Sequence, residues 1–531
     1  MGIFLNPNND NFLAEAKSLY VDKTMLIDVT NRYLDDPTFK FVCISRPRRF
    51  GKSIAEDMLA AYYSKGADSK ELFSRFKISK TASYEKNLNK FNVIKIDLNA
   101  RMSVWKTVAP KERSEENVIA FVQNQVCEEF REQFTDMDFG ESNSIASFIQ
   151  KIYKEKGETF IIIIDEYDVM VREQVSQEEF EIYLAFLNSL FKNAELKPAI
   201  SLAYLTGILP IIKDKIQSKL NTFKEYNMLH AGKFAEFTGF TTEEVKALCE
   251  KYDCSFDECK SWYDGYKVGD FEIYNPQAVV NAVVTGEFRS YWSHTSTYEV
   301  ISDKIQMNFD GIKDDVITML GGARIDVDVE LYKNSMTEFD TKDDAFTFLI
   351  HLGYLAYDAE EEQCYIPNRE IYKEWQHAIK KDSDYAETNK IIESSKNLLK
   401  ETLACNEKAV ATALDVSHIH VTSNRSYNNE DSLQSAIYLA FIYAINNYTI
   451  VKEMTAGKGF ADIVYIPLKA GSPALIVELK HNKSAQTALN QIKEKQYFDC
   501  LVNYSGEIIF VGISYDEDTK KHDCKIEKFV K

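Results

Sequence analysis

Four short apolar runs are separated by helical stretches in the first part of the chain. The runs cover residues 39–45, 91–99, 159–168 and 199–207. Each is rich in β-branched or aromatic residues and is short enough for one buried strand. Residues 178–194 are typical of the helices that lie between such runs. Strands that alternate with helices predict a parallel sheet covered by helices on both faces.

The pattern changes near Phe237, where helices and aromatic turns replace the regular alternation. Residues 343–375 predict a helix, a β-hairpin and a second helix, which is the order of a small winged-helix-like unit. A polar helical stretch follows at 386–405. The middle of the chain is therefore predicted to be mostly helical.

A third block of alternating pattern occupies the last part of the chain. We predict helix, strand, strand, helix and strand in turn for residues 430–447, 460–468, 473–481, 484–503 and 507–515. This αββαβ order is compact enough to form a domain of its own.

Composition limits the classes of protein that the chain can belong to. At 531 residues it is too long for a single core. A formal net charge of −19 argues against a passive nucleic-acid coat, although a local basic groove remains compatible with it. The nine cysteines are odd in number and form no CxxC pair, so we expect reduced thiols and a cytoplasmic protein. No apolar run reaches the length of a membrane span, and the first residues lack the features of a signal peptide, so we expect no membrane partner.

The stretch "SRPRRFGKSIAEDML" at 45–59 has the form of a phosphate-binding loop between a strand and a helix. Gly51 lets the backbone approach a phosphate closely. Lys52 would reach the β- and γ-phosphates of ATP or GTP, and Ser53 would hold Mg²⁺. Arg46 stands where such loops normally carry their first glycine. Alone, GKS could be a chance tripeptide at a helix start.

The strand "IIIIDEYD" supplies the second half of a nucleotide site. Asp165 would position Mg²⁺, and Glu166 would polarise the attacking water. Two acids at a strand end could also be surface charge or a helix cap. Thr206, at the end of the fourth strand, is placed to sense the γ-phosphate, although a structural turn explains it equally well.

A second set of reactive side chains lies in the third block. Asp462 falls in one predicted strand, while Glu478 and Lys480 fall in the next. Residues i and i+2 of a strand share a face, so Glu478 and Lys480 project together beside Asp462. Two carboxylates suit a hard divalent cation such as Mg²⁺ or Mn²⁺, and Lys480 could activate the attacking water. Glu430 on the preceding helix could reach this metal, and Gln491 on the following helix could position the site.

Other features near Asp462, Glu478 and Lys480 give weaker evidence about function. An isolated ExK is more often an amphipathic strand with solvated charges. Lysines slightly outnumber acids within 455–500, which gives limited support to contact with a nucleic-acid backbone. His418 and His420 alternate along an apparent strand and are interpreted as ordinary surface or core residues.

The motifs "RPRRFGKS", "IDEYD" and "YLTGILPI" resemble the AAA-ATPase-like domain that precedes a nuclease-like domain in many bacterial proteins. The resemblance continues through "FTGFTTEEV" and "WYDGYKVGDFEIYNP" and covers almost the whole chain. It implies that a loop beginning Arg-Pro-Arg-Arg is a family feature. Because Arg46 cannot take backbone conformations open only to glycine, the loop must be shaped differently. Arg48 or Arg49 could then assist Lys52 at the phosphates, although a solvated basic loop explains the three arginines equally well.

The D…ExK layout in "AGKGFADIVYIP…ALIVELKH" resembles the PD-(D/E)xK nuclease superfamily. Many relatives have Gly-x-Gly-Arg before the aspartate, and this chain has Phe460 in place of that arginine. The resemblance implies three domains: an AAA-ATPase-like P-loop domain at 1–236, a helical and winged-helix-like region at 237–385, and a nuclease-like domain at 386–531. The fold class is α/β and multidomain.

Three hypotheses of function follow. The leading one is a Mg²⁺-dependent nuclease that acts on DNA and is controlled by an attached ATP-binding module. The second is a nucleotide-dependent switch that binds nucleic acid or protein without cutting. The third, a small-molecule kinase, leaves the last 130 or so residues unexplained. The sequence leaves the oligomeric state open, a homo-oligomer included.

Overall fold

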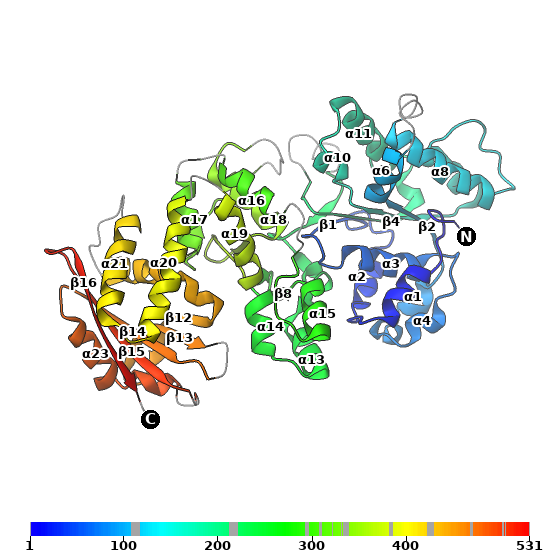
Figure 1. Cartoon of the computed structure of the whole chain (residues 1–531). Helices are drawn as coiled ribbons and strands as arrows, with labels where there is room; N and C mark the ends of the chain where they lie inside the picture. Colours follow the sequence, from blue (N-terminus) through cyan, green and yellow to red (C-terminus); the bar gives the residue numbers. More distant parts are fainter. Residues whose placement is uncertain are drawn as a thin grey trace. The chain divides into compact units, whose positions relative to one another are not determined.

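The computed structural model shows two compact units, to which the chain contributes alternating segments (Figure 1). Unit 1 holds residues 1–256, 264–287 and 326–364. Unit 2 holds residues 257–263, 288–325 and 365–531. The predicted boundaries at 236/237 and 385/386 remain a prediction. The structure describes residues 2–107, 117–211, 221–292, 297–306, 309, 311–320, 322–330, 332, 339–381, 386–421, 430–467, 471–501, 504 and 506–529.

Unit 1 is built on the predicted parallel sheet, whose strand order is β2-β3-β4-β1-β5. All of its pairings are parallel. The strands are β1 (Phe41–Ser45), β2 (Asn92–Asp97), β3 (Phe160–Asp165), β4 (Ile200–Gly207) and β5 (Lys224–Tyr226). Because β1 and β3 both lie next to β4, their carboxyl ends meet at one edge of the sheet. Crevices at that edge are where open α/β sheets hold ligands.

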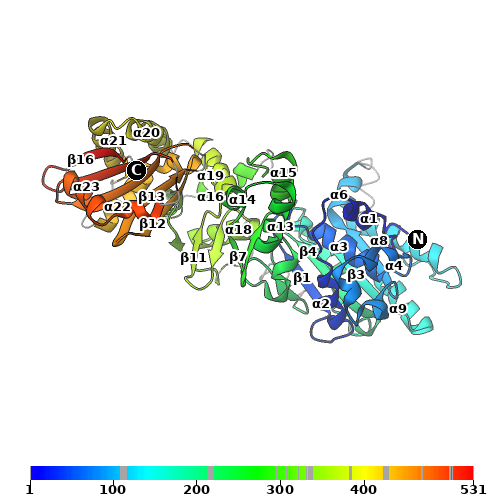
Figure 2. The same ribbon diagram turned by 90° about the horizontal axis from the view of Figure 1, so that it is seen from below.

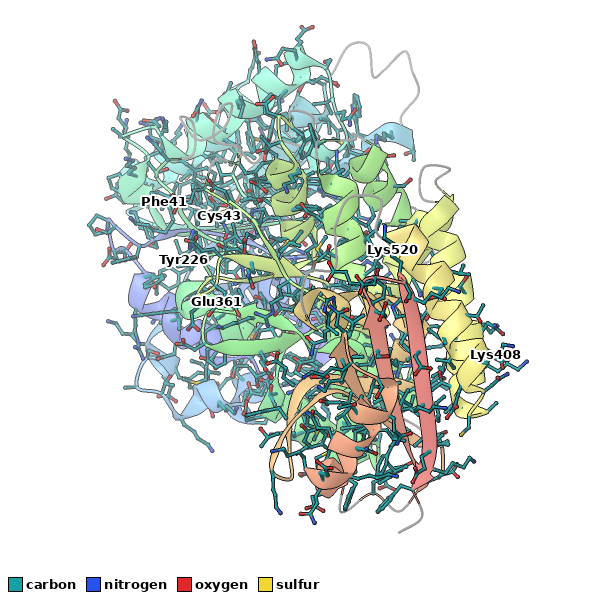
Figure 3. All side chains as sticks on the ribbon, turned by 90° about the vertical axis from the view of Figure 1, so that its left-hand side faces the viewer. Phe41, Cys43, Tyr226, Glu361, Lys408 and Lys520 are labelled. Atoms are coloured by element: carbon teal, nitrogen blue, oxygen red, sulfur yellow. The ribbon has the colours of Figure 1, made fainter. Side chains whose placement is uncertain are left out.

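Helices cover both faces of this sheet, as the alternating pattern predicts (Figure 1). One face packs against α8 (Val118–Gln133), α9 (Ile145–Lys156) and α11 (Gln177–Phe191). The other packs against α2 (Met25–Tyr33) and α3 (Lys52–Tyr63). Strand β5 lies beside β1, with Cys43 opposite Glu225 and Ile44 opposite Tyr226; Phe41, Cys43 and Tyr226 are labelled in Figure 3. Every residue of β1, β3 and β4 is buried, which explains their continuous apolar sequences.

The middle of the chain contains the predicted helix–hairpin–helix. It consists of α18 (Lys342–Leu352), β10 (Ala356–Asp358), β11 (Gln363–Tyr365) and α19 (Arg369–Lys381). A second small sheet, β6-β8-β7, accompanies α13 (Thr242–Tyr252), α14 (Phe256–Tyr263) and α15 (Pro276–Thr285). That the helix–hairpin–helix forms a winged-helix-like unit remains a prediction.

The third block forms a five-stranded mixed sheet in the order β12-β13-β14-β15-β16. Its strands are β12 (Tyr448–Ala456), β13 (Gly459–Pro467), β14 (Ala474–His481), β15 (Ile508–Asp516) and β16 (Lys521–Phe529). Only β14 and β15 pair in parallel. Helix α21 (Glu407–Val421) packs against β16, whereas α23 (Ala485–Glu494) packs against β14 and β15 (Figure 2).

The predicted αββαβ order is present within this longer arrangement, but three details were wrong. The edge strands β12 and β16 were missed. The two helices end earlier than predicted, since α22 (Glu430–Ala440) and α23 each give way to a short 3₁₀ turn. His418 and His420 belong to helix α21 and not to a strand, because Val410 and Leu414 place a buried helical stripe in this segment.

All nine cysteines are free thiols. In the described part of the chain, none of the helices has the length and apolar character that crossing a membrane requires.

Candidate functional site

The predicted phosphate-binding loop connects β1 to α3 in unit 1. Gly51 precedes the helix with φ of 83°, a left-handed conformation that glycine adopts without strain. A Cβ atom at this position would meet nothing within 4 Å, so the glycine is required by its backbone conformation and not by crowding. The first turn of α3 thus begins at an open surface with its N–H groups available to an anion.

Lys52 is folded over this loop. Its side chain is buried, and its Nζ donates to the carbonyl oxygens of Arg46 and Pro47, each at 3.0 Å. Burial lowers the pKa of Lys52, while the nearby carboxylate of Asp165 acts in the opposite direction. Phosphate oxygens are stronger acceptors than carbonyls because they are charged. The ammonium group therefore lies where a phosphate could replace its two present partners.

Arg46 does not point outward from the loop. Its side chain is 1% exposed, and Nη1 donates to the carbonyl oxygens of Ser45 at 2.8 Å and Tyr226 at 3.1 Å. Burial lowers the pKa of Arg46 to about 10. The guanidinium group joins the end of β1 to β5, which gives it a structural role beneath the loop. Arg48 and Arg49 are both exposed, and Arg49 has a positive φ of 71°.

Ser53, Asp165 and Thr206 meet at the carboxyl edge of the sheet. Ser53 Oγ donates to Asp165 Oδ2 at 2.6 Å. The other carboxylate oxygen, Oδ1, accepts from Thr206 Oγ1 at 2.6 Å and from the Glu166 amide at 2.9 Å. The structure thus brings together a hydroxyl from α3 and a carboxylate from β3, as the two sequence motifs predict. Thr206 is buried and bonded to carboxyl groups, so its hydroxyl does not face the open side of the loop.

Glu166 follows Asp165 in a left-handed conformation, with φ of 52°. Strained backbone of this kind is common at functional sites. The Glu166 carboxylate accepts a hydrogen bond from Arg172 at the end of helix α10 (Val169–Arg172). Arg172 also lies 3.2 Å from Asp168, whose carboxylate accepts from the amides of Ile208 and Leu209.

Sequence reasoning missed Arg172 and Asp168. The available signal was "DEYDVMVR", which places a cation six residues after Glu166 and four after Asp168. Through these two residues, the glutamate is connected to the loop that follows β4.

The second predicted site forms in unit 2 where β13 and β14 separate. Their last paired residues are Ile463 and Val477, so the next step along each strand places Asp462 beside Glu478. Asp462 Oδ2 accepts from the Leu479 amide at 2.7 Å. The Glu478 side chain is 1% exposed. Two carboxylates from neighbouring strands are therefore adjacent, one of them buried and the other half-buried.

Lys480 and Gln491 both contact Glu478, as their predicted positions require. Lys480 Nζ lies 2.9 Å from Glu478 Oε1 and donates to the Leu479 carbonyl at 2.8 Å. Gln491, on α23, donates to the same Oε1 and lies 3.0 Å from the Tyr497 hydroxyl. Tyr497 was given no role from the sequence, and the available signal was its place at the end of "QIKEKQY", six residues after Gln491.

Glu478 combines a raised pKa with a buried carboxyl oxygen that accepts no hydrogen bond from the described residues. Burial, followed by the negative charge of Asp462, raises the pKa of Glu478 to about 7, while Lys480 acts in the opposite direction. Glu478 Oε2 is buried and has no hydrogen-bond partner among the described residues. A divalent cation at this oxygen would favour the ionised carboxylate.

Among the described residues, Asp462 and Glu478 are the two carboxylates available as ligands at this site. In the described part of the chain, no three His, Cys, Asp or Glu side chains gather to hold a metal. A cation would therefore need main-chain oxygens, water or substrate oxygens in addition to Asp462 and Glu478. Glu430 is the first residue of α22, but its side chain lies outside the described part. Phe460, two residues before Asp462, is 62% exposed.

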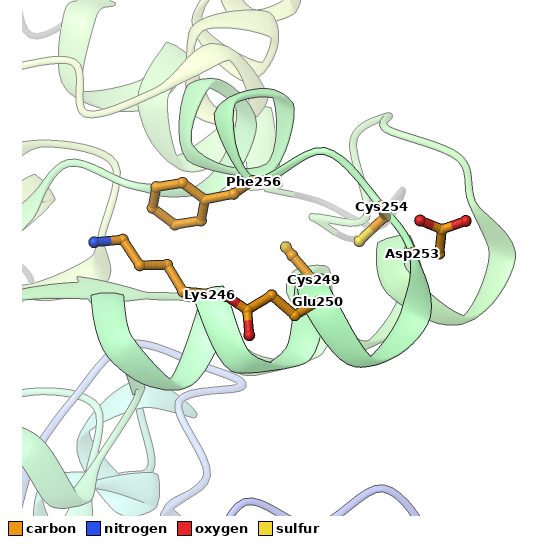
Figure 4. A pocket seen from close by; sticks show the side chains of 6 residues that line it. All are labelled: Lys246, Cys249, Glu250, Asp253, Cys254 and Phe256. Atoms are coloured by element: carbon orange, nitrogen blue, oxygen red, sulfur yellow. The ribbon is translucent and has the colours of Figure 1, made fainter.

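A separate pocket of about 340 Å³ lies in unit 1 beside α13 (Figure 4). The Lys246 ammonium lies 5.3 Å from the centre of the Phe256 ring in this pocket. Its lining consists of Lys246, Cys249, Glu250, Asp253, Cys254 and Phe256, and contains none of the predicted site residues.

Comparison with known proteins assigns the two sites to known domain types. Residues 9–217 match a family model described as "Predicted AAA-ATPase", and residues 428–524 match the PD-(D/E)XK nuclease superfamily. The chain carries an AAA-ATPase-like domain and a PD-(D/E)XK nuclease-superfamily domain. The first match contains Lys52, Asp165 and Thr206, and the second contains Asp462 and Glu478.

Individual relatives give less information about this chain than the two family models do. An uncharacterized protein from the vnfD 5′ region of Azotobacter chroococcum mcd 1 is 25% identical over 290 residues, which cover 54% of this chain and 52% of the relative. The chain therefore spans about half the length of this curated relative.

Three solved structures show only weak similarity. Cdc6p from Pyrobaculum aerophilum is 11% identical with a TM-score of 0.26, covering 68% of this chain and 93% of that one. ORC2 from Aeropyrum pernix is 11% identical with a TM-score of 0.30, covering 69% and 97%. Drosophila ORC bound to DNA is 9% identical with a TM-score of 0.26, covering 70% and 91%. At TM-scores this low, these structures carry no information about the function of this chain.

Proposed function

We propose that the protein is a Mg²⁺-dependent nuclease that acts on DNA and is controlled by ATP binding and hydrolysis at its P-loop. The observation that carries this proposal is the meeting of Asp462, Glu478 and Lys480 between β13 and β14. A protein that only binds nucleic acid needs no such trio.

Each residue of the trio has a distinct chemical task. Asp462 and Glu478 would hold the cation, which supplies a polarised water and neutralises charge on the scissile phosphate. Lys480 already lies against Glu478, so its ammonium group can orient the attacking water or stabilise the developing negative charge. Gln491 keeps the Glu478 carboxylate oriented toward the strand gap.

The P-loop has its own set of tasks. Lys52 would bind the β- and γ-phosphates of ATP or GTP, with Arg48 and Arg49 exposed nearby as further cations. Ser53 and Asp165 would hold the Mg²⁺ that accompanies the nucleotide. Glu166 would polarise the hydrolytic water, and its contact with Arg172 limits the directions in which it can point.

Glu166→Gln should preserve nucleotide binding and slow hydrolysis. The amide keeps the shape of the side chain but cannot accept a proton, and general-base catalysis typically contributes about 100-fold or more. Binding is measured by calorimetry with ATP and hydrolysis by phosphate release. Glu173→Gln is a matched control, because Glu173 pairs with exposed Lys106 on the same unit. Equal hydrolysis by wild type and Glu166→Gln would remove Glu166 from the mechanism.

A switch that binds without cleavage is the second candidate. Phe460 favours it, because the resemblance to the nuclease superfamily implies an arginine before the aspartate, and this chain has an exposed phenyl ring there. Purified protein incubated with plasmid and with single-stranded DNA, with and without Mg²⁺, Mn²⁺ and ATP, separates the two candidates. Metal-dependent cleavage supports the nuclease, whereas nucleotide-dependent binding of intact DNA supports the switch.

A further inference from the structure

A fully buried carboxyl group, Glu56, lies behind the P-loop on α3. It is three residues after Ser53 and has no exposed surface. Its Oε1 lies 2.5 Å from Thr206 Oγ1. Its Oε2 is buried and has no hydrogen-bond partner among the described residues. A bare, ionised carboxylate in such a place would be strongly destabilising.

The number of hydrogens available at Thr206 decides the state of Glu56. Thr206 Oγ1 lies within hydrogen-bond distance of two carboxyl oxygens, on Glu56 at 2.5 Å and on Asp165 at 2.6 Å. A hydroxyl group has one hydrogen and can donate to only one of them. The other contact therefore needs a proton on a carboxyl group.

That proton belongs on Glu56. Asp165 accepts from Ser53 and from the Glu166 amide in addition to Thr206, so three donors already face its two oxygens. Glu56 has no comparable set of donors. Burial, and next the charge of Asp165, raises the pKa of Glu56 well above its ordinary value.

We propose that Glu56 is a positioning residue for the nucleotide-associated metal site. As a neutral acid it donates to Thr206, Thr206 donates to Asp165 Oδ1, and Asp165 Oδ2 is left facing Ser53. This deepens the role proposed above for the P-loop and rests on it. It also gives Thr206 a different task from contact with the γ-phosphate: the hydroxyl transmits the constraint from Glu56 to Asp165.

The chain of hydrogen bonds from Glu56 through Thr206 to Asp165 predicts a specific difference between two Glu56 variants. Glu56→Gln retains an N–H donor of the same shape and should bind mant-ATP with a Mg²⁺ requirement within about threefold of wild type. Glu56→Leu and Thr206→Val each break this chain of hydrogen bonds. Both should raise the required Mg²⁺ concentration by about 10- to 100-fold, which is the usual effect of losing a hydrogen-bond partner of a metal ligand. Binding of mant-ATP in EDTA should be unchanged in all three variants.

Glu15 provides a matched control in the same unit. It is also a carboxyl group whose pKa is raised by burial, to about 7, but it interacts with Asp57 and Lys95 and is not hydrogen-bonded to Thr206. Glu15→Leu should leave the Mg²⁺ requirement unchanged, because Glu15 takes no part in the contacts between Thr206 and Asp165. If Glu56→Leu instead lost stability in general, mant-ATP binding would weaken both with Mg²⁺ and in EDTA.

Two results would overturn the proposal. If Glu56→Gln raises the required Mg²⁺ concentration as much as Glu56→Leu does, the metal site depends on an ionised Glu56 carboxylate and not on a neutral donor. If wild type binds nucleotide and both Glu56 variants have the wild-type Mg²⁺ requirement, Glu56 does not position the metal site.

An infrared measurement keeps the proposal testable even if wild type binds no nucleotide, which would contradict the P-loop function itself. The wild type minus Glu56→Gln difference spectrum at about pH 7, where an ordinary carboxyl group is ionised, should contain the carbonyl stretch of a neutral carboxyl group. Its absence would contradict the proposed state of Glu56.

Discussion

Lys52→Ala should abolish nucleotide binding. The ammonium group of Lys52 now donates to two loop carbonyls, and both donors would serve phosphate oxygens in the complex. Hydrogen bonds to a charged partner contribute about 1.5–3 kcal/mol each, so losing two corresponds to a fall in affinity of more than about 100-fold. Calorimetric titration of ATP with Mg²⁺ measures this change.

Lys40 offers a close control for this experiment. It is also buried, at 8% exposure, and its Nζ donates to the carbonyls of Lys197 and Ile200, each at 2.8 Å. It lies before β1, whereas the loop follows that strand. Lys40→Ala should therefore lose stability and keep nucleotide affinity. An unchanged affinity in Lys52→Ala would contradict the P-loop assignment.

Asp462→Asn and Glu478→Gln should each lose both metal affinity and cleavage. Each substitution removes one of two adjacent negative charges while keeping the size of the side chain, so the fold is preserved and the attraction for a divalent cation falls. Mn²⁺ titration measures the first effect and plasmid nicking the second. Glu527→Gln is the control, because Glu527 lies on the edge strand β16, where it pairs with exposed Lys493 of α23. If Asp462→Asn nicks DNA at the wild-type rate, the metal site lies elsewhere.

The sequence predicts the central elements well because their patterns are extreme. β3 consists of buried residues throughout, so "FIIIID" is unambiguous. Glu478 and Lys480 are two residues apart on one strand, so the alternation of β-structure alone places them together. Asp462 lies on the preceding strand, where an antiparallel pairing brings it to Glu478.

The missed elements have weaker local patterns. β16 reads "KHDCKIEKF", which is highly charged because it is an edge strand with few buried positions. In "SHIHV", alternating apolar residues suggested a strand, but the segment ends a helix whose buried stripe lies at Val410 and Leu414.

Contacts between distant parts of the chain could not be predicted. Arg46 bonds to the carbonyl of Tyr226, and Thr206 bonds to Glu56, across 180 and 150 residues respectively. No local pattern marks either pair. The sequence therefore identifies which side chains carry the chemistry, while the structure identifies the residues that hold them.

The most direct test of the proposed nuclease is Mn²⁺ binding and plasmid nicking measured in parallel on wild type and Lys480→Ala. Removing an ammonium group beside two carboxylates should leave Mn²⁺ affinity unchanged or slightly higher, because a repelling charge is gone. Cleavage should fall by about 10²- to 10⁴-fold, since activation of the nucleophile needs that group in place. A wild type that neither binds Mn²⁺ nor nicks any DNA or RNA, with or without ATP, would contradict the nuclease and leave the switch in its place.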